Sequence, residues 1–468
     1  MLMKLLSFHK LFLRQGVAIR GHTEEEGNLY QDLKCRCEGV PGLEAWLRKG
    51  EYRSHDIINE LIELMCMKVL RELLAEIRDA ECYSIIADET RDLSGAEQFS
   101  VSIRWVDSEY NISEDLIGMV EVENTTAEVL TSVIKDTLLR CVLPLSQCRG
   151  QAYDGAANMA GCISGVAKRL QEDEPSALFV HCLAHNLNLC LQDCGRQCDA
   201  VKEALNLTSG VATIIRASPK RFAIFRHLQE EFNMDASGLK PLCPTRWTVR
   251  TGAINAILKN YEIICNELEQ VSKDSGPSAS NASGYVALME RFQTFFGLRL
   301  SYLVFSATEQ LSRTLQGHDL NAQDAAMAVS QAVSFLTRQR SDAAFSEFFQ
   351  ATVSKSKNLT EPPKLRRPKS IPKRLDDGSA NHTFTSPESF FRHQYFEVLD
   401  LVINEMRRRF NQPSFAILKE IESLLLKSCS GVTTQPSESL SALYAKDLDL
   451  DRLKVQLCML PDLVRLRM

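Results

Sequence analysis

Two acidic positions could do chemistry together although they lie far apart in the chain. Asp88 ends an apolar run in CYSIIADET and precedes Glu89, and Asp154 follows CRGQAY and precedes Gly155. Carboxylate oxygens are preferred ligands of Mg²⁺ or Mn²⁺, and two ions held by acids can activate the attacking oxygen and stabilise the leaving one in phosphoryl transfer. The pair therefore predicts a metal-dependent site. The alternatives are a hairpin turn or strand-end cap at Asp88 and an ordinary turn at Asp154.

The surrounding elements must bring these acids together. Periodicity predicts, in chain order, a helix over 55–80, strands near 82–88, 98–106 and 112–121, a helix at about 126–140, a strand over 148–154, a helix through 165–170, a strand over 177–182 and a helix over 185–201. A three-strand meander followed by two crossovers is the ribonuclease-H-like α/β arrangement. In such a sheet the first and fourth strands are parallel neighbours, so we expect Asp88 and Asp154 to converge.

Composition limits the classes of protein that fit. The chain has 468 residues, of which 44% are hydrophobic and 24% charged, enough for two or three domains. A net charge of −6 argues against coating nucleic acid by bulk charge, so any DNA contact must come from local basic patches. Fifteen scattered cysteines without a CxxC pair favour reduced thiols in cytosol or nucleus. The N-terminal apolar run predicts an amphipathic helix, and no run approaches the ~18 residues that span a bilayer.

Several motifs resemble the transposase-derived proteins of the hAT superfamily. IIADETRDLSGAEQFSVSIRWVD, AYDGAANMAG, HCLAHNLNL and TRW occur in this order, and the similarity extends from LRQGVAIRGH and YRSHDIINELIELM to about residue 460. The chain is similar to vertebrate MYM-type and TTF-type zinc-finger proteins, which share a central domain of undefined function. The resemblance implies a ribonuclease-H-like core with a large all-helical insertion and an acidic triad for metal-dependent cutting and joining of DNA.

The resemblance implies that the first two acids of the triad are Asp88 in IIADET and Asp154 in AYDGA. In active members the third acid is a glutamate near the C-terminus in a Ser-Glu-Arg-x-Phe-Ser-like motif. Ser437-Glu438 in PSESLSALY lacks the following Arg and Phe, so this role is not transferred to Glu438. We expect the chain to lack that glutamate, the adjacent dimerisation region and the preceding zinc finger. Whether the chain catalyses DNA cleavage and whether it dimerises therefore stay open alternatives.

Cys182 and His185 match the family's Cys-x-x-His pattern. As zinc ligands they would need two more partners, and Cys190, Cys194 and Cys198 stand at i, i+4 and i+8 on the next helix. Free cysteines also behave as small apolar residues, and a stripe at helical spacing is typical of a packed face. We expect Cys182 and His185 to pack and hydrogen-bond beneath the acidic site, with structural zinc as the alternative.

Arg246 and Trp247, in CPTRWTVR, match the family's Arg-Trp pair. The resemblance implies a position near the active site, where the pair supports DNA or the core. A tryptophan that anchors a loop beside a surface arginine is the alternative. We expect a structural role.

A basic segment in PPKLRRPKSIPKRLDDG is the main candidate for nucleic-acid contact or nuclear import. Its cations are Lys364, Arg366, Arg367, Lys369, Lys373 and Arg374. Prolines favour an extended, exposed chain, which suits phosphate contacts, and a solvated linker is the alternative. Arg407, Arg408 and Arg409 on a later helix could extend this patch or complement the helix dipole.

We expect five regions. They are a helical N-terminal region (1–80), the ribonuclease-H-like core (81–204), the all-helical insertion (205–352), a basic Pro/Ser-rich linker (353–388) and a helical C-terminal part shorter than the family's (389–468). Within the insertion, SKDSGPSASNASG (272–284) predicts a flexible polar loop. The aromatic run from Phe292 to Phe305 predicts buried core.

The sequence thus predicts a domesticated or truncated hAT-type transposase-like protein. We expect it to be nuclear and non-catalytic, to bind DNA or other nuclear proteins, and to make no membrane contact. One alternative is a metal-dependent DNA transposase that uses Asp88, Asp154 and an unidentified Glu. Another is a protein-interaction scaffold without DNA affinity, which weak binding insensitive to salt would indicate.

Overall fold

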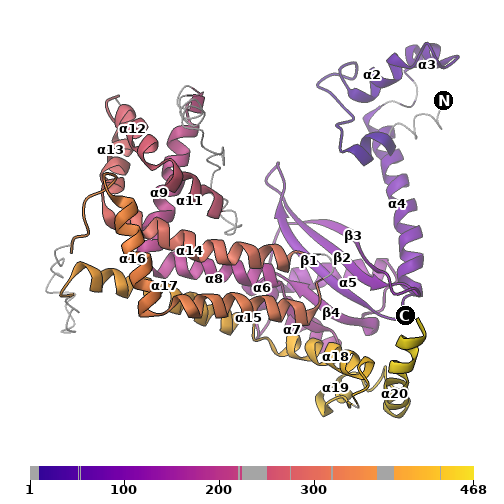
Figure 1. The fold of residues 1–468 in the computed structure, drawn as a ribbon. Helices are drawn as coiled ribbons and strands as arrows, with labels where there is room; N and C mark the ends of the chain where they lie inside the picture. The colour runs from indigo at the N-terminus through magenta and orange to yellow at the C-terminus, as the bar shows by residue number, and fades with distance from the viewer. Residues whose placement is uncertain are drawn as a thin grey trace. The chain divides into compact units, whose positions relative to one another are not determined.

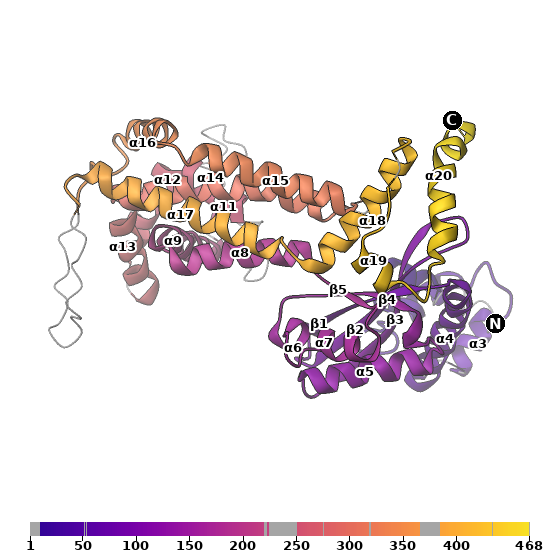
Figure 2. The same cartoon turned by 90° about the horizontal axis from the view of Figure 1, so that it is seen from below.

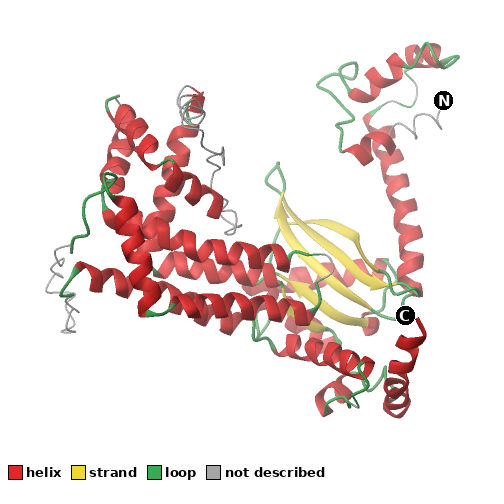
Figure 3. Cartoon of the chain, in the orientation of Figure 1, coloured by secondary structure: helices red, strands yellow, loops and turns green. Residues whose placement is uncertain are grey.

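The computed structural model describes residues 10–50, 52, 54–219, 222–223, 250–274, 276–317, 320–365, 384–432 and 434–467. Its strands form one five-stranded sheet, and helices make up most of the rest (Figure 3). The chain divides into two compact units, residues 1–150 and residues 151–468. The mixed α/β class expected from the sequence is therefore observed, and each unit is described by itself.

In the first unit, a helical segment over residues 10–15 precedes helices α2 (Asn28–Cys35), α3 (Leu43–Lys49) and α4 (His55–Asp79) (Figure 1). Residues that precede the sheet in the chain form a small apolar core, which includes Leu33, Leu43 and Trp46. Ser54 caps α4 by accepting a hydrogen bond from the Ile57 backbone N–H at 3.4 Å. The long helix predicted over 55–80 is confirmed.

An antiparallel meander follows α4. It consists of β1 (Tyr83–Arg91), β2 (Glu97–Val106) and β3 (Ile112–Val122). Alternate residues of β2 are buried because one face of the meander forms core: these are Phe99, Val101, Ile103 and Trp105. The register pairs Ile85 with Ile103 and Ala87 with Val101, so apolar side chains meet on that face. The three predicted strands are confirmed.

Helix α5 (Ala127–Arg140) packs against β2 and β3 (Figure 2). A Cβ atom at Gly118 would lie 2.9 Å from Thr137 Cγ2, so glycine allows the helix this close approach. The later strands are β4 (Cys148–Tyr153) and β5 (Leu178–His181), and the strand order is β3-β2-β1-β4-β5. This is the order that the ribonuclease-H-like prediction requires.

The second unit is mainly helical. Its helices are α6 (Ala157–Ala160), α7 (Val166–Asp173), α8 (Leu183–Gln197), α9 (Asp199–Arg216), α11 (Arg250–Lys259), α12 (Tyr261–Ser272), α13 (Pro277–Met289), α14 (Phe292–Leu315), α15 (Ala322–Gln339), α16 (Asp342–Ser356), α17 (Pro387–Arg409), α18 (Pro413–Cys429), α19 (Glu438–Leu443) and α20 (Leu450–Arg467). The long helices α8, α14, α15 and α17 lie side by side (Figures 1 and 2). The expected region boundaries at 204/205 and 352/353 fall inside α9 and α16, so continuous helices join those regions.

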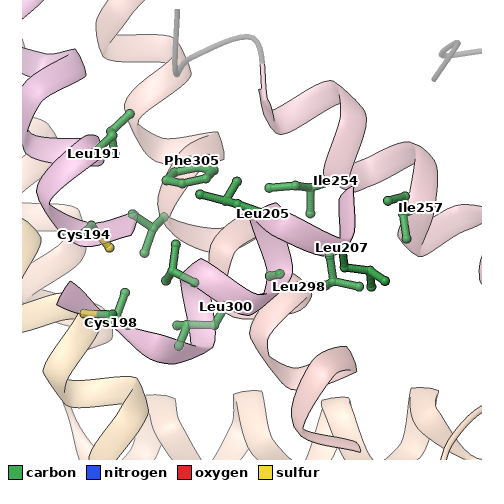
Figure 4. Packing of buried hydrophobic residues seen from close by; sticks show 14 of the residues in the cluster. Leu191, Cys194, Cys198, Leu205, Leu207, Ile254, Ile257, Leu298, Leu300 and Phe305 are labelled. Carbon is green, nitrogen blue, oxygen red and sulfur yellow. The ribbon is translucent and has the colours of Figure 1, made fainter. Parts of the chain in front are cut away.

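Helices α8, α9, α11 and α14 share one apolar core. Figure 4 shows Cys194, Leu205, Leu300 and Phe305 within this packing. The predicted aromatic core is confirmed, because Phe296 is fully buried and its ring centroid lies 4.8 Å from that of Phe391 on α17. Cys190, Cys194 and Cys198 are buried in the same core, so the cysteine stripe is a packed face.

One predicted loop is a helix. Residues 272–284 were expected to form a flexible polar loop, but α13 begins at Pro277 and continues to Met289. Proline is favourable in the first turn of a helix, where its missing N–H has no partner to lose. Ala282 and Met289 are fully buried, and the Tyr261 hydroxyl donates to the Met289 carbonyl at 2.6 Å. Tertiary packing therefore outweighs the polar composition.

Candidate functional site

Asp88 lies within β1 and not at its end. The strand was expected to stop at this residue, but it continues to Arg91, which forms an ion pair with Glu97 of β2 at 3.0 Å. That pair and the continued backbone ladder extend the hairpin beyond the apolar run. Asp88 is exposed. The backbone carbonyl of Asp88 accepts a hydrogen bond from Ser100 Oγ at 3.0 Å, which fixes its place opposite β2.

The acid that forms the β1–β2 turn is Asp92. Its Oδ1 accepts hydrogen bonds from the Ser94 N–H at 2.8 Å, the Ser94 hydroxyl at 2.6 Å and the Ala96 N–H at 3.0 Å. Its Oδ2 accepts one from Gln98 Nε2 at 3.1 Å. The Ser94 hydroxyl is the largest cause of a pKa for Asp92 below its usual range. The hairpin-turn role considered as an alternative for Asp88 therefore belongs to Asp92.

Asp154 directly follows β4, as the sequence predicts. It is half-buried, and its Oδ1 accepts a hydrogen bond from the Ala156 N–H at 3.1 Å, which forms an Asx turn. A Cβ atom at Gly155 would lie 2.4 Å from His181 Nε2. Glycine is therefore needed here to leave room for the imidazole.

His181, at the end of β5, is a site residue that the sequence reasoning missed. Its pKa lies below the usual value because burial, the largest cause, lowers it by more than the Cys182 carbonyl and the charge of Asp154 raise it. Its ring lies 5.9 Å from that of His185, centroid to centroid. Its backbone N–H donates to Gln412 Oε1 at 2.9 Å, which ties β5 to the start of α18. The first histidine of VHCLAH was the signal in the sequence that could have indicated this site residue.

Cys182 and His185 lie at the beginning of α8. The Cys182 backbone N–H donates to the Tyr153 carbonyl at 3.0 Å, so the segment is held to the end of β4. The Cys182 side chain is exposed, which contradicts the expected packing, whereas His185 is half-buried. Within the described ranges, no group of three or more His, Cys, Asp or Glu side chains is placed to hold a metal ion.

Two of the three arginines at the end of α17, Arg408 and Arg409, form ion pairs within the unit. Arg409 Nη2 donates to Asp193 Oδ2 at 2.7 Å and its Nε donates to Glu405 Oε2 at 3.0 Å. Arg408 also pairs with Glu405, and this contact is the largest cause of the lowered pKa of the Glu405 carboxyl. These two arginines join α17 internally and to α8, so they are not a free basic patch.

Several predicted site residues lie outside the described residues. They are Arg246, Trp247, Arg366, Arg367, Lys369, Lys373 and Arg374. Lys364 is described and forms an ion pair with Glu361 at 2.8 Å. Asp88 belongs to the first unit and Asp154 to the second. The convergence of their carboxylates therefore stays a prediction.

Comparison with known proteins supports the fold predicted from the sequence. Residues 1–165 match the family model described as DUF4371, ZMYM1/FAM200, RNase-like domain. This range contains both Asp88 and Asp154, and its name fits a ribonuclease-H-like core. In the described part of the chain, no helix combines the length and the apolar character needed to cross a membrane.

Two relatives are similar beyond that range. The chain is 24% identical over 333 residues to the human "52 kDa repressor of the inhibitor of the protein kinase", covering 65% of this chain and 43% of that protein. It is 26% identical over 265 residues to the mouse protein of the same name, covering 52% and 34%. The matched region spans less than half the length of either relative. Together with the family match, these similarities support a hAT-derived family.

Proposed function

We propose that this chain is part of a domesticated hAT-type transposase-like protein, related to the MYM-type and TTF-type zinc-finger proteins. It acts in the nucleus by binding DNA, together with nuclear protein partners, and does not cut DNA. The observation that carries the proposal is the five-stranded sheet with order β3-β2-β1-β4-β5, whose first strands lie in the segment that matches the RNase-like family. The repressor name of the two relatives supports a regulatory role.

The basic segment is the surface we assign to DNA. The net charge of −6 requires that phosphate contacts come from a local patch. Arg408 and Arg409 are paired with acids, so these two arginines contribute little to such a patch. The six cations between Lys364 and Arg374 lie among prolines that keep a chain extended, which suits contacts along a phosphate backbone.

DNA binding is tested by fluorescence anisotropy with a short labelled duplex across a salt series. The intact chain is expected to bind with a steep salt dependence, and exchange of the six segment cations for Gln should weaken binding and flatten the slope by up to about 0.9 per lost phosphate contact. A matched control exchanges three exposed lysines and three exposed arginines of the first unit: Arg14, Lys34, Lys49, Lys68, Arg71 and Arg140. It should leave affinity and slope closer to those of the intact chain.

The protein-scaffold alternative predicts a different result in the same assay. Binding that is weak and insensitive to salt, and equal for both six-site variants, would overturn the DNA proposal. The search for function would then turn to protein partners.

The enzyme alternative takes support from the adjacency of β1 and β4 in the strand order, since Asp88 lies in β1 and Asp154 directly follows β4. Carboxylate oxygens of Asp88 and Asp154 suit Mg²⁺ or Mn²⁺, which would supply an activated water or hydroxyl for phosphoryl transfer. A calorimetric Mn²⁺ titration of the intact chain and Asp154→Asn tests this alternative, with the exposed Asp451→Asn as control. Binding lost only in Asp154→Asn would favour a retained metal site and justify strand-cleavage assays.

A further inference from the structure

The helical unit contains an apolar groove that none of the assigned roles uses. Helices α11, α14, α15 and α16 line a cavity of about 700 Å³. Its apolar side chains include Leu258, Phe295, Tyr302, Leu303, Phe335 and Phe348. This volume is within the range of natural binding sites, which is roughly 300–1,000 Å³.

One wall of the groove carries a half-buried arginine. Arg299 on α14 has its guanidinium carbon 5.5 Å from the centre of the Phe348 ring, and its Nη1 donates to the Ala351 carbonyl at 3.3 Å. Burial lowers the pKa of Arg299. Among the residues that the structure describes, no carboxylate forms an ion pair with it. A desolvated cation of this kind gains much from an incoming anion, because its neutral partners do not compensate its charge.

Two lysines add to the positive charge of the groove. Lys259, at the end of α11, and Lys355, near the end of α16, both line it and are exposed. Neither forms an ion pair within the described ranges, and no Asp or Glu is among the described residues of the lining. The groove therefore combines an apolar floor with three cations, a pattern that is complementary to a chain carrying both apolar and acidic side chains.

We propose that this groove binds an acidic amphipathic helix of a partner protein. The apolar face of the helix packs on the leucine and aromatic side chains, and its carboxylates pair with Lys259, Arg299 and Lys355. A DNA backbone fits less well, because the apolar lining offers phosphates no partner. The chain's own basic segment is repelled, since Lys364 to Arg374 contributes six cations of the same sign. The inference does not depend on the DNA-binding role proposed above.

The probe is a labelled synthetic helix of about five turns, with Leu and Phe at every third or fourth position and Glu elsewhere. A control peptide keeps the apolar residues and carries Lys in place of Glu. Anisotropy with the full chain is expected to show binding of the acidic peptide alone, and added salt should weaken it.

Charge reversal separates the groove from the rest of the surface. The double variant Lys259→Glu with Lys355→Glu should weaken binding of the acidic peptide about tenfold, because two exposed attractions become repulsions. The matched control reverses two exposed lysines that do not line the groove, Lys202→Glu with Lys273→Glu, and should bind like the intact chain.

Arg299→Met gives a second, sharper test. It removes a half-buried charge while keeping a long apolar side chain, so the melting temperature is expected to be unchanged or higher. The same variant should lose most of its affinity for the acidic peptide. Loss of affinity without loss of stability is a result that unfolding cannot produce.

Three outcomes would overturn the proposal. The Lys peptide could bind as well as the Glu peptide, or duplex DNA could displace the acidic peptide from the groove. Binding could also emerge only after residues 366–383 are replaced by a Gly/Ser linker of equal length, in which case the occupant is this chain's own segment.

Discussion

Two loops that each contain an aspartate after a strand use that residue differently. In the β1–β2 turn, Asp92 is exposed and accepts four hydrogen bonds, from Ser94, Ala96 and Gln98. In the loop after β4, Asp154 is half-buried and accepts one from the Ala156 N–H. The first carboxylate is satisfied by its own turn. The second interacts with His181, whose pKa is lowered by burial, and the charge of Asp154 opposes part of that shift.

The comparison separates a structural acid from a candidate functional one. Asp107 repeats the Asp92 arrangement in the β2–β3 turn, where Asn111 is the largest cause of its lowered pKa. In both turns, groups of the chain itself donate the hydrogen bonds that a bound ligand could otherwise donate to the carboxylate. Asp154 has a titratable neighbour, His181, on another element. A proton, a cation or a phosphate that binds near Asp154 would therefore interact with the charges of both side chains.

The largest effect is expected from Gly155→Ala. The new methyl group would lie 2.4 Å from His181 Nε2 and 3.0 Å from Leu189 Cδ1, so the imidazole or the loop must move, at a cost of about 1–3 kcal/mol. The matched variant in the other loop is Gly95→Ala, where space is open but φ is +90°, which costs about 1–2 kcal/mol. Urea unfolding followed by circular dichroism measures both. If Gly155→Ala were as stable as the intact chain, the imidazole would not be held against the loop.

A smaller effect is expected from the titration of His181. Because burial lowers its pKa, the folded chain binds this proton less readily than the unfolded chain. Its contribution to stability is therefore present above the unfolded pKa of about 6.5 and is lost as pH falls toward the lowered folded value. The stability of the intact chain should fall more than that of His181→Gln between pH 7.5 and pH 5, values chosen to bracket the unfolded pKa.

Exposed His393→Gln serves as the control for that titration. Its stability should follow the intact chain across the pH range. Parallel curves for the intact chain and His181→Gln would show that the Cys182 carbonyl and the charge of Asp154, which raise the pKa of the imidazole, fully offset its burial.

The local pattern of the sequence was sufficient for most elements of the sheet. The meander and the helix over 55–79 follow from alternation and from helical spacing, which depend on neighbouring residues only. The end of β1 could not be found in this way, since the Arg91–Glu97 pair that prolongs it lies across the hairpin. The helix expected over 185–201 also breaks at Cys198, which ends α8 and begins α9 with an extended ψ of 111°.

The candidate site was only partly predictable for the same reason. A motif could indicate Asp154, because the acid after a strand is a local signal. The contact between Gly155 and His181 joins two loops that packing brings together, and no spacing in the sequence specifies it. Likewise, the exposure of Cys182 depends on how α8 leaves β5, so the packing expected for this side chain was wrong.

The smallest effect compares the two acids directly. Asp92→Asn should lower stability at pH 7, because the charged oxygens that the Ser94 hydroxyl and three further donors favour are replaced by a neutral amide. Asp154→Asn should change stability less, since an amide oxygen can still accept from the Ala156 N–H. The pKa of Asp92 is depressed in the fold, so its contribution is present above the unfolded pKa of about 3.9 and is lost as pH falls through the folded value. Urea midpoints at neutral and strongly acidic pH should thus separate the two variants at the first and bring them together at the second, whereas a larger loss for Asp154→Asn at neutral pH would make that carboxylate the structural one.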